Sequence, residues 1–277
     1  MDYLAGPELR GRGSGTIDEY HAARYIARRL RQYGLSPAAG ARRYIQTVTI
    51  PSRAGRIAHT WNVLAKIEGS KEGSQVILLS AHLDHLGVKH GKTYPGADDD
   101  ASGTVAVMEL ARVLARQSRP ERTIVFALWG SEELGLLGAR YFLKHPTFDL
   151  HDLVANLEFE MIGRVDLKVQ PDQLWLTGWE RTDLGPALAA HGAQLVADPH
   201  PERNFFTRSD NYALARDGII AQTISSYGLH KDYHQPTDTL GKIEWQHLDS
   251  AIGSMIAPLS WLANSDFAPR WREGQKP

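Results

Sequence analysis

The chain has 277 residues, a length that suits one large α/β domain with a sizeable hydrophobic core. Its 31 Lys and Arg residues balance 32 Asp and Glu residues, so we expect neither a nucleic-acid partner nor strong attraction to an anionic membrane. Cysteine is absent, which excludes disulfides and thiolate metal sites. The 12 histidines and the carboxylates therefore remain as metal ligands.

The sequence carries no pattern that inserts it into a membrane. No apolar run approaches the ~18 residues that span a bilayer. The opening residues, MDYLAGPELRGRGSGT, lack a signal-peptide pattern and lie close to the first predicted helix. A processed N-terminus is compatible with this start, so the missing signal does not decide the compartment.

Hydrophobic periodicity predicts the elements of the first part of the chain. They are a helix at 16–33, capped by Thr16 or Ser14, and strands at 44–50, 60–67 and 75–80. The polar GSKEGS segment predicts a hairpin turn that joins the last two strands.

Strands and helices alternate through the rest of the chain. We predict helices at 104–117, after Ser131 to about 143, at 183–191 and at 244–262, and strands at 123–129, 153–159, 174–178 and 218–225. Residues 199–210 are expected to be irregular and the tail from Asn264 to be loose. This alternation without a linker predicts a single three-layer α/β domain with a mostly parallel central sheet.

Four predicted strands lead into His or carboxylate residues, and ligands of open α/β sheets gather beyond such strand ends. These residues are His82 and Asp84, Glu132 and Glu133, Glu158 and Glu160, and the loop residues His230, Asp232 and His234. Each group alone has an ordinary explanation. Asp98–Asp100 could cap a helix, for example, and Glu132 and Glu133 could be first-turn glutamates favoured by the helix dipole. One metal site would explain all of the groups together.

Six motifs in this order resemble the family 28 zinc aminopeptidases, which include glutamate carboxypeptidase II and the glutaminyl cyclases. They are AHLDHLG (81–87), GADDDASG (96–103), GSEELGLLGA (130–139), NLEFEMIGR (156–164), FTRSDNY (206–212) and DYHQPTDT (232–239). The likeness extends from about residue 5 to residue 262. It implies a three-layer zinc-exopeptidase fold, in which helices flank a mixed, mostly parallel sheet of about eight strands, and it implies two zinc ions.

The resemblance also implies roles for individual residues. Zinc ligands would be His82 and Glu160 on the first ion, Glu133 and His234 on the second, and Asp99 between them. Glu132 would be the general base, Asp84 would orient His82, and Tyr233 would donate to the oxyanion. A cis peptide is implied at Asp99–Asp100. Glu160 stands where the family most often has Asp, which changes the reach of this ligand. Asp98 and Asp100 are left as loop and cap residues, and His85 and His90 have no assigned role.

The substrate side is less specific in sequence. A peptide with a free N-terminus is the expected substrate, and Phe206, Arg208 and Tyr227 are candidates for a pocket, although the same apolar clusters could be ordinary core. Ten residues separate Ile50 from Trp61, so the protease-associated domain that some relatives insert is missing, and the active site should be open.

Three alternatives use the same fold. A glutaminyl cyclase would need one zinc ion, a carboxypeptidase would need Arg203 or Arg208 to bind a terminal carboxylate, and a non-catalytic relative would have lost ligands. The family resemblance favours a secreted or periplasmic protein and leaves the cytoplasm open. A monomer is the default expectation.

Overall fold

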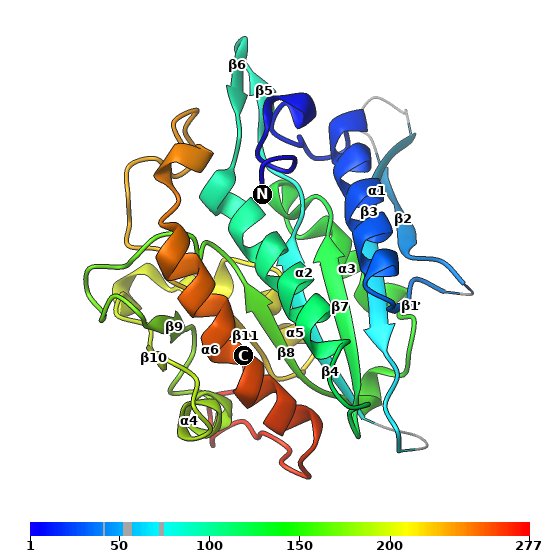
Figure 1. Ribbon diagram of the computed structural model, residues 1–277, viewed down its shortest axis with the longest axis vertical. Coiled ribbons are helices and arrows are strands. Elements are labelled where there is room, and N and C mark those ends of the chain that lie inside the picture. The colour runs from blue at the N-terminus through cyan, green and yellow to red at the C-terminus, as the bar shows by residue number, and fades with distance from the viewer. Residues whose placement is uncertain (41, 52–56, 72–74) are drawn as a thin grey trace.

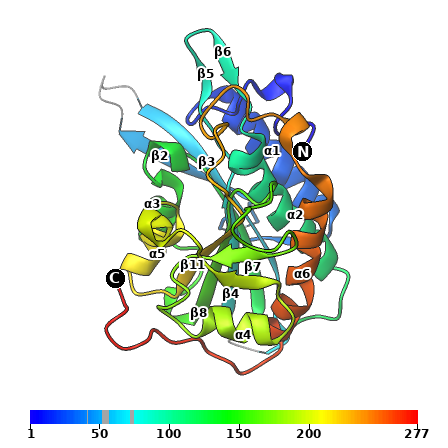
Figure 2. The ribbon, with the colours of Figure 1, turned by 90° about the vertical axis from the view of Figure 1, so that its left-hand side faces the viewer.

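The computed structural model describes residues 1–40, 42–51, 57–71 and 75–277. Their main feature is a nine-stranded sheet with helices on both faces (Figures 1 and 2). Its strands are β1 (Ser36–Pro37), β2 (Ile45–Pro51), β3 (Ile57–Ile67), β4 (Val76–His82), β7 (Thr123–Trp129), β8 (Leu153–Phe159), β9 (Leu174–Leu176), β10 (Leu195–Ala197) and β11 (Ala221–Ser225). A separate hairpin, β5 (Gly87–Lys89) and β6 (Lys92–Tyr94), projects beyond the sheet (Figure 1).

The sheet is mixed, as predicted, with the order β1-β3-β7-β4-β8-β11-β9-β10 and β2 also paired to β3. Its four central strands, β7, β4, β8 and β11, run parallel. Strand β3 is antiparallel to β7, and β9 is antiparallel to β11. The parallel strands are buried on both faces, which explains their continuous apolar runs.

The predicted hairpin between β3 and β4 is wrong, because β7 lies between these two strands. Val63–Ile67 pairs antiparallel with Ile124–Leu128, while β7 pairs in parallel with β4 from Val76 to His82. The composition of a turn indicates where the chain reverses direction. It does not indicate which strand pairs with β3, and here a strand more distant in sequence, β7, lies between β3 and β4. Residues 72–74 of the predicted turn lie outside the described residues.

Helices cover the two faces of the sheet unequally. They are α1 (Ile17–Gln32), α2 (Gly103–Leu114), α3 (Leu137–Lys144), α4 (Leu184–Ala190), α5 (Asn211–Arg216) and α6 (Trp245–Ala263). Short 3₁₀ turns lie at Pro7–Leu9, Glu132–Leu134, Leu150–Asp152, Pro201–Arg203, Phe205–Thr207 and Leu240–Lys242, and a π-helical turn at Ala97–Ser102. Figure 2 shows α1, α2 and α6 on one side of the sheet and α3 and α5 on the other.

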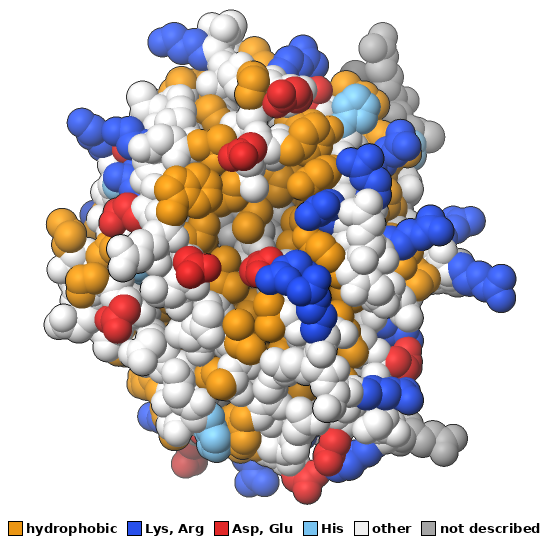
Figure 3. All heavy atoms as spheres, viewed as in Figure 1, with side chains coloured by type: hydrophobic (Ala, Val, Ile, Leu, Met, Phe, Trp, Pro, Cys, Tyr) orange, Lys and Arg blue, Asp and Glu red, His pale blue; other side chains and the backbone are white. Residues whose placement is uncertain are grey.

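Successive side chains of the strands point to opposite faces of the sheet and contribute to a hydrophobic core on each side. Ile77 and Leu79 of β4 pack on the side of α1, α2 and α6, whereas Leu78 packs on the side of α3 and α5. On the outer surface above α2 and α6, hydrophobic side chains gather near the middle, with charges of both signs around them (Figure 3). Across the described part of the chain, no helix combines the length and hydrophobicity needed to cross a bilayer.

The C-terminal tail is packed, so the prediction of a loose tail is wrong. The indole N–H of Trp271 donates to the carbonyl of Gly218 at 3.1 Å, and the amide of Arg272 donates to Arg181 at 2.8 Å. Phe267 and Trp271 also pack against the core. Two aromatic side chains in a short polar segment are enough to fix it to the surface.

Candidate metal centre and active site

The candidate site lies beyond the carboxyl ends of the central parallel strands. His82 is the last residue of β4 and pairs in register with Trp129, the last residue of β7. The Ser131–Glu133 turn follows β7 directly, and Glu160 follows β8. The loop after β11 brings His234 to the same place, so four segments distant in sequence meet at one edge of the sheet.

Two groups of ligand atoms share Asp99. In one group, atoms of His82, Asp99 and Glu160 all lie within 4.8 Å of one another, and Nε2 of His82 is 3.3 Å from Oδ1 of Asp99. In the other, atoms of His85, Asp99 and Glu133 meet the same limit. Nε2 of His234 lies 3.1 Å from Oδ2 of Asp99 and 3.3 Å from Oε2 of Glu133.

Several buried polar atoms at this place lack a hydrogen-bond partner within the described part of the chain. Among the described residues, neither ring nitrogen of His82 makes a hydrogen bond, nor does Nε2 of His85, and all three atoms are buried. Orphaned groups of this kind are rare in folded proteins because each carries a desolvation cost. Converging imidazole nitrogens and carboxylate oxygens without sulfur form a donor set that suits zinc.

The three consecutive aspartates have different partners, and Asp99 alone of the three reaches the histidines of both groups. Asp100 accepts the amides of His82 at 3.2 Å and Met161 at 3.1 Å, which ties the ends of β4 and β8 together. It also accepts the amide of Gly103, so it caps α2 as expected.

Asp98 is more than a loop residue. Its carboxylate accepts the amide of Gly163 at 2.8 Å and contacts Nε2 of His230 at 2.9 Å. The carboxylate of Asp238 accepts the amides of Asp98 and Asp99. These bonds orient the loop so that Asp99 faces the cluster, and the Asp99–Asp100 peptide is cis, as the family resemblance implied.

Asp84 contacts the turn that carries Glu132. Its Oδ1 accepts the amide of Glu132 at 3.0 Å and lies 3.7 Å from Nδ1 of His82, which is longer than a hydrogen bond. Its Oδ2 accepts the hydroxyl of Ser14 at 2.5 Å and the amide of Glu133 at 3.4 Å. In this structure Asp84 therefore holds the Glu132 turn more directly than it holds His82.

Adjacent glutamates acquire opposite pKa shifts. Burial raises the pKa of Glu132 well above its ordinary value, against the influence of His82, and nearby Asp210 raises it further. Burial and Asp99 also raise the pKa of Glu133, but His234 and His85 outweigh them and lower it to about 2. One carboxyl is thus suited to holding a proton and its neighbour to remaining ionised, a separation typical of acid–base sites.

His85 belongs to the cluster, although its sequence context left it without a role. Its Nδ1 lies 2.8 Å from Oε1 of Glu133, and its side chain is fully buried. A Cβ added to Gly96 would come within 2.5 Å of the imidazole ring, so a side chain there would displace it. The histidine three positions after His82 was a visible signal, but only the fold reveals that it turns toward Glu133.

Glu158 is buried below the cluster and joins neither ligand group. Its carboxylate makes no hydrogen bond within the described residues, and burial followed by the nearby charge of Asp210 raises its pKa. Asp232, from the loop after β11, is also outside both groups, because it pairs with Arg164 at 2.9 Å.

A small hollow of about 30 Å³ lies beside Glu160. Its walls include Trp175, Phe205, Tyr227, Tyr233 and Arg208. Tyr227 and Arg208, which were predicted to line a pocket, therefore line this hollow.

Phe206 lies elsewhere. It belongs to the hydrophobic core on the side of α3 and α5, with the guanidinium of Arg181 over its ring at 4.6 Å. The neighbouring Phe205 takes the predicted place in the wall, because consecutive residues of a 3₁₀ turn point in different directions. Arg203 does not line this hollow, and its guanidinium lies 3.9 Å from Glu202.

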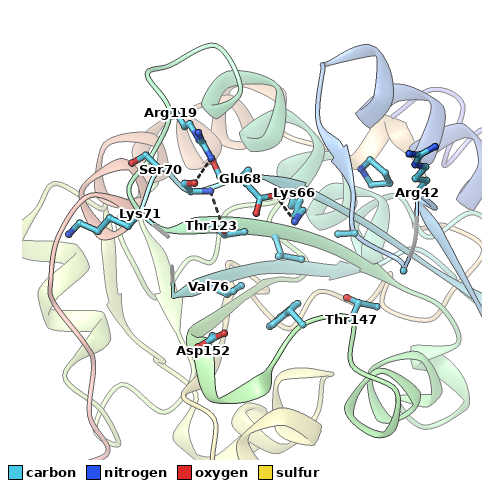
Figure 4. A pocket seen from close by; sticks show the side chains of 16 residues that line it. Arg42, Lys66, Glu68, Ser70, Lys71, Val76, Arg119, Thr123, Thr147 and Asp152 are labelled. Carbon is cyan, nitrogen blue, oxygen red and sulfur yellow. Dashed lines mark hydrogen bonds and ion pairs between the residues drawn. The ribbon is translucent and has the colours of Figure 1, made fainter. Parts of the chain in front are cut away.

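A much larger cavity, of about 740 Å³, lies at the other end of β4 and β7. Val76 and Thr123, at the amino ends of these strands, help to line it, together with Lys66 and Arg119 (Figure 4). None of the residues around Asp99 borders this cavity. The volume of a cavity therefore does not identify the candidate site in this protein. The convergence of ligand atoms around Asp99 identifies it.

Residues 62–259 match the family model described as "Peptidase family M28". Because the match covers more than half of the chain, the chain belongs to this family, and the resemblance inferred from the motifs is confirmed. The structural neighbours also confirm the fold. LapA aminopeptidase of Legionella pneumophila matches with a TM-score of 0.71 and 21% identity over 95% of this chain and 71% of its own. A glutaminyl cyclase of Porphyromonas gingivalis matches with a TM-score of 0.68 and 19% identity over 91% and 93%.

Curated relatives are longer than this chain. "Leucine aminopeptidase 2" of Trichophyton rubrum is 28% identical over 66% of the chain and 41% of the relative. A probable zinc metalloprotease of Leptosphaeria maculans is 36% identical over 56% and 37%, and a vacuolar membrane protease of Laccaria bicolor is 41% identical over 62% and 15%. The chain thus spans less than half the length of these relatives.

Proposed function

We propose that this chain is a two-zinc aminopeptidase that removes residues from the free N-terminus of peptides, with residues 1–277 acting as one catalytic domain. The observation that carries the proposal is the position of Asp99, which belongs to both groups of ligand atoms. A carboxylate shared in this way suits a pair of metal ions that act on one substrate.

The residues fit two zinc sites. His82, Asp99 and Glu160 would hold one ion, and Asp99, Glu133 and His234 the other, with His85 against Glu133. Glu160 would serve in place of aspartate, and one of its carboxylate oxygens lies within 4.8 Å of the ligand atoms of His82 and Asp99. When bound, zinc lowers the pKa of water to about 7 and polarises a carbonyl.

Glu132 is the proposed general base. It would take the proton from the attacking water as the new C–O bond forms, and pass it to the leaving nitrogen as the C–N bond breaks. Such proton transfer contributes about 10²–10⁴-fold to rate. The raised pKa of Glu132 supports this role, because a more basic carboxylate takes a proton from water more readily.

Tyr233 is the proposed donor to the oxyanion. Burial and the charge of Asp99 raise the pKa of its phenol, so the hydroxyl keeps its proton and remains a donor. Its oxygen accepts a hydrogen bond from Arg208 at 3.4 Å. A fixed donor in a partly buried site stabilises developing negative charge better than water does.

Two features support action at a free N-terminus. The hollow beside Glu160 is bounded by aromatic residues, which suits the side chain of a terminal residue. Beyond the effect of burial, Glu160 and Glu132 lie close enough for the charge of Glu160 to raise the pKa of Glu132, and an α-ammonium group bound between them would relieve that repulsion.

Hydrolysis of aminoacyl-nitroanilides tests the proposal. Activity should disappear with a chelator, return with zinc, and fall by about 10²-fold or more in Glu132→Gln. Glu202→Gln, an exposed glutamate, is the control. Full activity in Glu132→Gln, or in protein that retains no metal, would refute the mechanism.

A glutaminyl cyclase is the second candidate, because the Porphyromonas gingivalis cyclase aligns over 93% of its own chain. Incubation with glutaminyl peptides separates the two functions. Cyclisation with one zinc per chain would favour the cyclase, whereas hydrolysis with two would favour the aminopeptidase.

A further inference from the structure

The N-terminal segment 12–19 reaches three loops of the candidate site from outside the part of the chain that matches the family model, residues 62–259. Gly13 forms a parallel bridge with His85, and the amide of Ser14 donates to the carbonyl of His85 at 3.3 Å. This segment then enters α1, whose first turn lies against β3 and the turn after β7. Three of its side chains, those of Arg12, Ser14 and Glu19, form hydrogen bonds with loops of the site.

Arg12 holds the two loops that carry histidine and aspartate ligands. Its guanidinium is buried and donates to the carbonyls of Leu83 at 2.9 Å and Gly96 at 3.0 Å. It also donates to the carbonyls of Leu4 and Pro95, both at 2.7 Å. One side chain thus joins the loop after β4 to the loop that precedes Asp99.

Glu19 holds the turn that carries Glu132. Its Oε1 accepts the amide of Ser131 at 2.9 Å and the hydroxyl of Thr60 at 2.5 Å. Its Oε2 accepts the amide of Gly15 at 2.6 Å. The side chain is completely buried, so these bonds are shielded from water.

The turn itself needs external support. Ser131 has a φ of 52°, a left-handed conformation that costs a non-glycine residue energy. Glu19 accepts the amide of Ser131, and Asp84 accepts the amides of Glu132 and Glu133. Ser14 in turn donates to Asp84. The consecutive amides of residues 131–133 are therefore fixed by the carboxylates of Glu19 and Asp84. Glu19 comes from α1, and Asp84 is held by Ser14 of the same N-terminal segment.

We propose that Glu19 is a positioning residue for the general base, fixing the backbone of the Ser131–Glu133 turn so that the Glu132 carboxylate faces the reacting water. The inference rests on the proposed peptidase function. Glu19 touches neither substrate nor metal in this role and acts through Ser131. Because misplacement by about 1 Å can reduce catalysis about 10²-fold, loss of this contact should lower kcat.

Glu19→Ala and Glu19→Gln test the role together. Alanine removes the bonds that the carboxylate accepts from Ser131, Thr60 and Gly15, so kcat should fall about 10²-fold with KM and bound zinc unchanged. Glutamine keeps an oxygen for the Ser131 amide and loses only the bond to Gly15, so it should recover most of kcat. Asp18→Ala is the matched control, because Asp18 lies in the same helical turn and pairs with Arg10 at 2.8 Å.

Zinc content and circular dichroism separate positioning from folding. Thr60→Val, which removes one bond that orients Glu19, provides a milder variant and should lower kcat less than alanine does. Unchanged kcat in folded Glu19→Ala would overturn the inference. If alanine prevents folding, wild-type kcat in Thr60→Val would overturn it instead, because this variant removes a bond that orients Glu19. Glu132→Gln is measured in parallel: if it is inactive while Glu19→Ala is fully active, only the positioning role fails, whereas an active Glu132→Gln removes the proposed function itself.

Discussion

Nδ1 of His85 lies 2.8 Å from Oε1 of Glu133, and this contact adds a histidine to the zinc site expected around His234. Ligating carboxylates usually have their own hydrogen-bond partners, and mutation of such partners typically costs about 10–100-fold in metal affinity. His85 is buried against the cluster, so it can act on Glu133 without competition from water.

His85→Ala should therefore weaken zinc binding about 10–100-fold while the protein stays folded. Competition with a chromophoric chelator measures this affinity without depending on activity. His90→Ala is the matched control, since His90 lies five residues further on and is exposed. Equal zinc affinity in the two variants would show that His85 does not support the site.

Asp99→Asn should lower the occupancy of both zinc sites, because its two oxygens face different ligand groups. His82→Ala should lower the occupancy of one site only. Zinc per chain, measured by mass spectrometry of the native protein, distinguishes these outcomes. If Asp99→Asn retains one ion at full affinity, Asp99 is not shared, and the two-ion arrangement fails.

Much of this site could be predicted because its residues follow strand ends in recognisable motifs. His82, Glu133 and Glu160 each stand where a buried apolar strand stops, and parallel strands bring such ends to one edge. The side-chain partners were harder to predict. The bond from Ser14 to Asp84 joins residues 70 positions apart, and no local pattern indicates it.

The errors in the fold have the same physical origin. Strand β3 and strand β4 were correctly located, but the pairing of β3 with β7 depends on contacts remote in sequence. Phe205 and Phe206 are chemically alike, so composition could not say which one faces the hollow. Local pattern determines elements, whereas pairing and side-chain direction depend on the assembled sheet.

Glu19→Gln should also change how stability depends on pH. Burial, and then the charge of Asp84, raises the pKa of Glu19 to about 8 from an ordinary value of 4.5. Between these values the folded protein holds a proton that the unfolded chain releases, so this carboxyl makes the free energy of unfolding decrease as pH rises. Its stabilising contribution is complete below about pH 4.5 and is lost as pH approaches 8.

Glutamine removes that titration. Relative to wild type, Glu19→Gln should therefore gain stability as pH rises from 5 to 8, as measured by urea unfolding at fixed ionic strength. Glu273→Gln, an exposed glutamate near the C-terminus, is the control and should follow wild type. A constant difference between Glu19→Gln and wild type across this range would contradict the raised pKa.

Arg208 should limit the size of the terminal side chain that the site accepts. The hollow beside Glu160 has a volume of about 30 Å³, comparable to the space of one water molecule, and Arg208 is its exposed wall residue. Its guanidinium lies over the rings of Phe205 at 5.0 Å and Tyr233 at 6.0 Å. Arg208→Ala should thus increase kcat/KM for leucyl relative to alanyl nitroanilides, because it opens the hollow.

Phe206→Leu, which changes the neighbouring core position, should leave this ratio unchanged. An equal ratio in Arg208→Ala and wild type would show that the terminal side chain binds elsewhere.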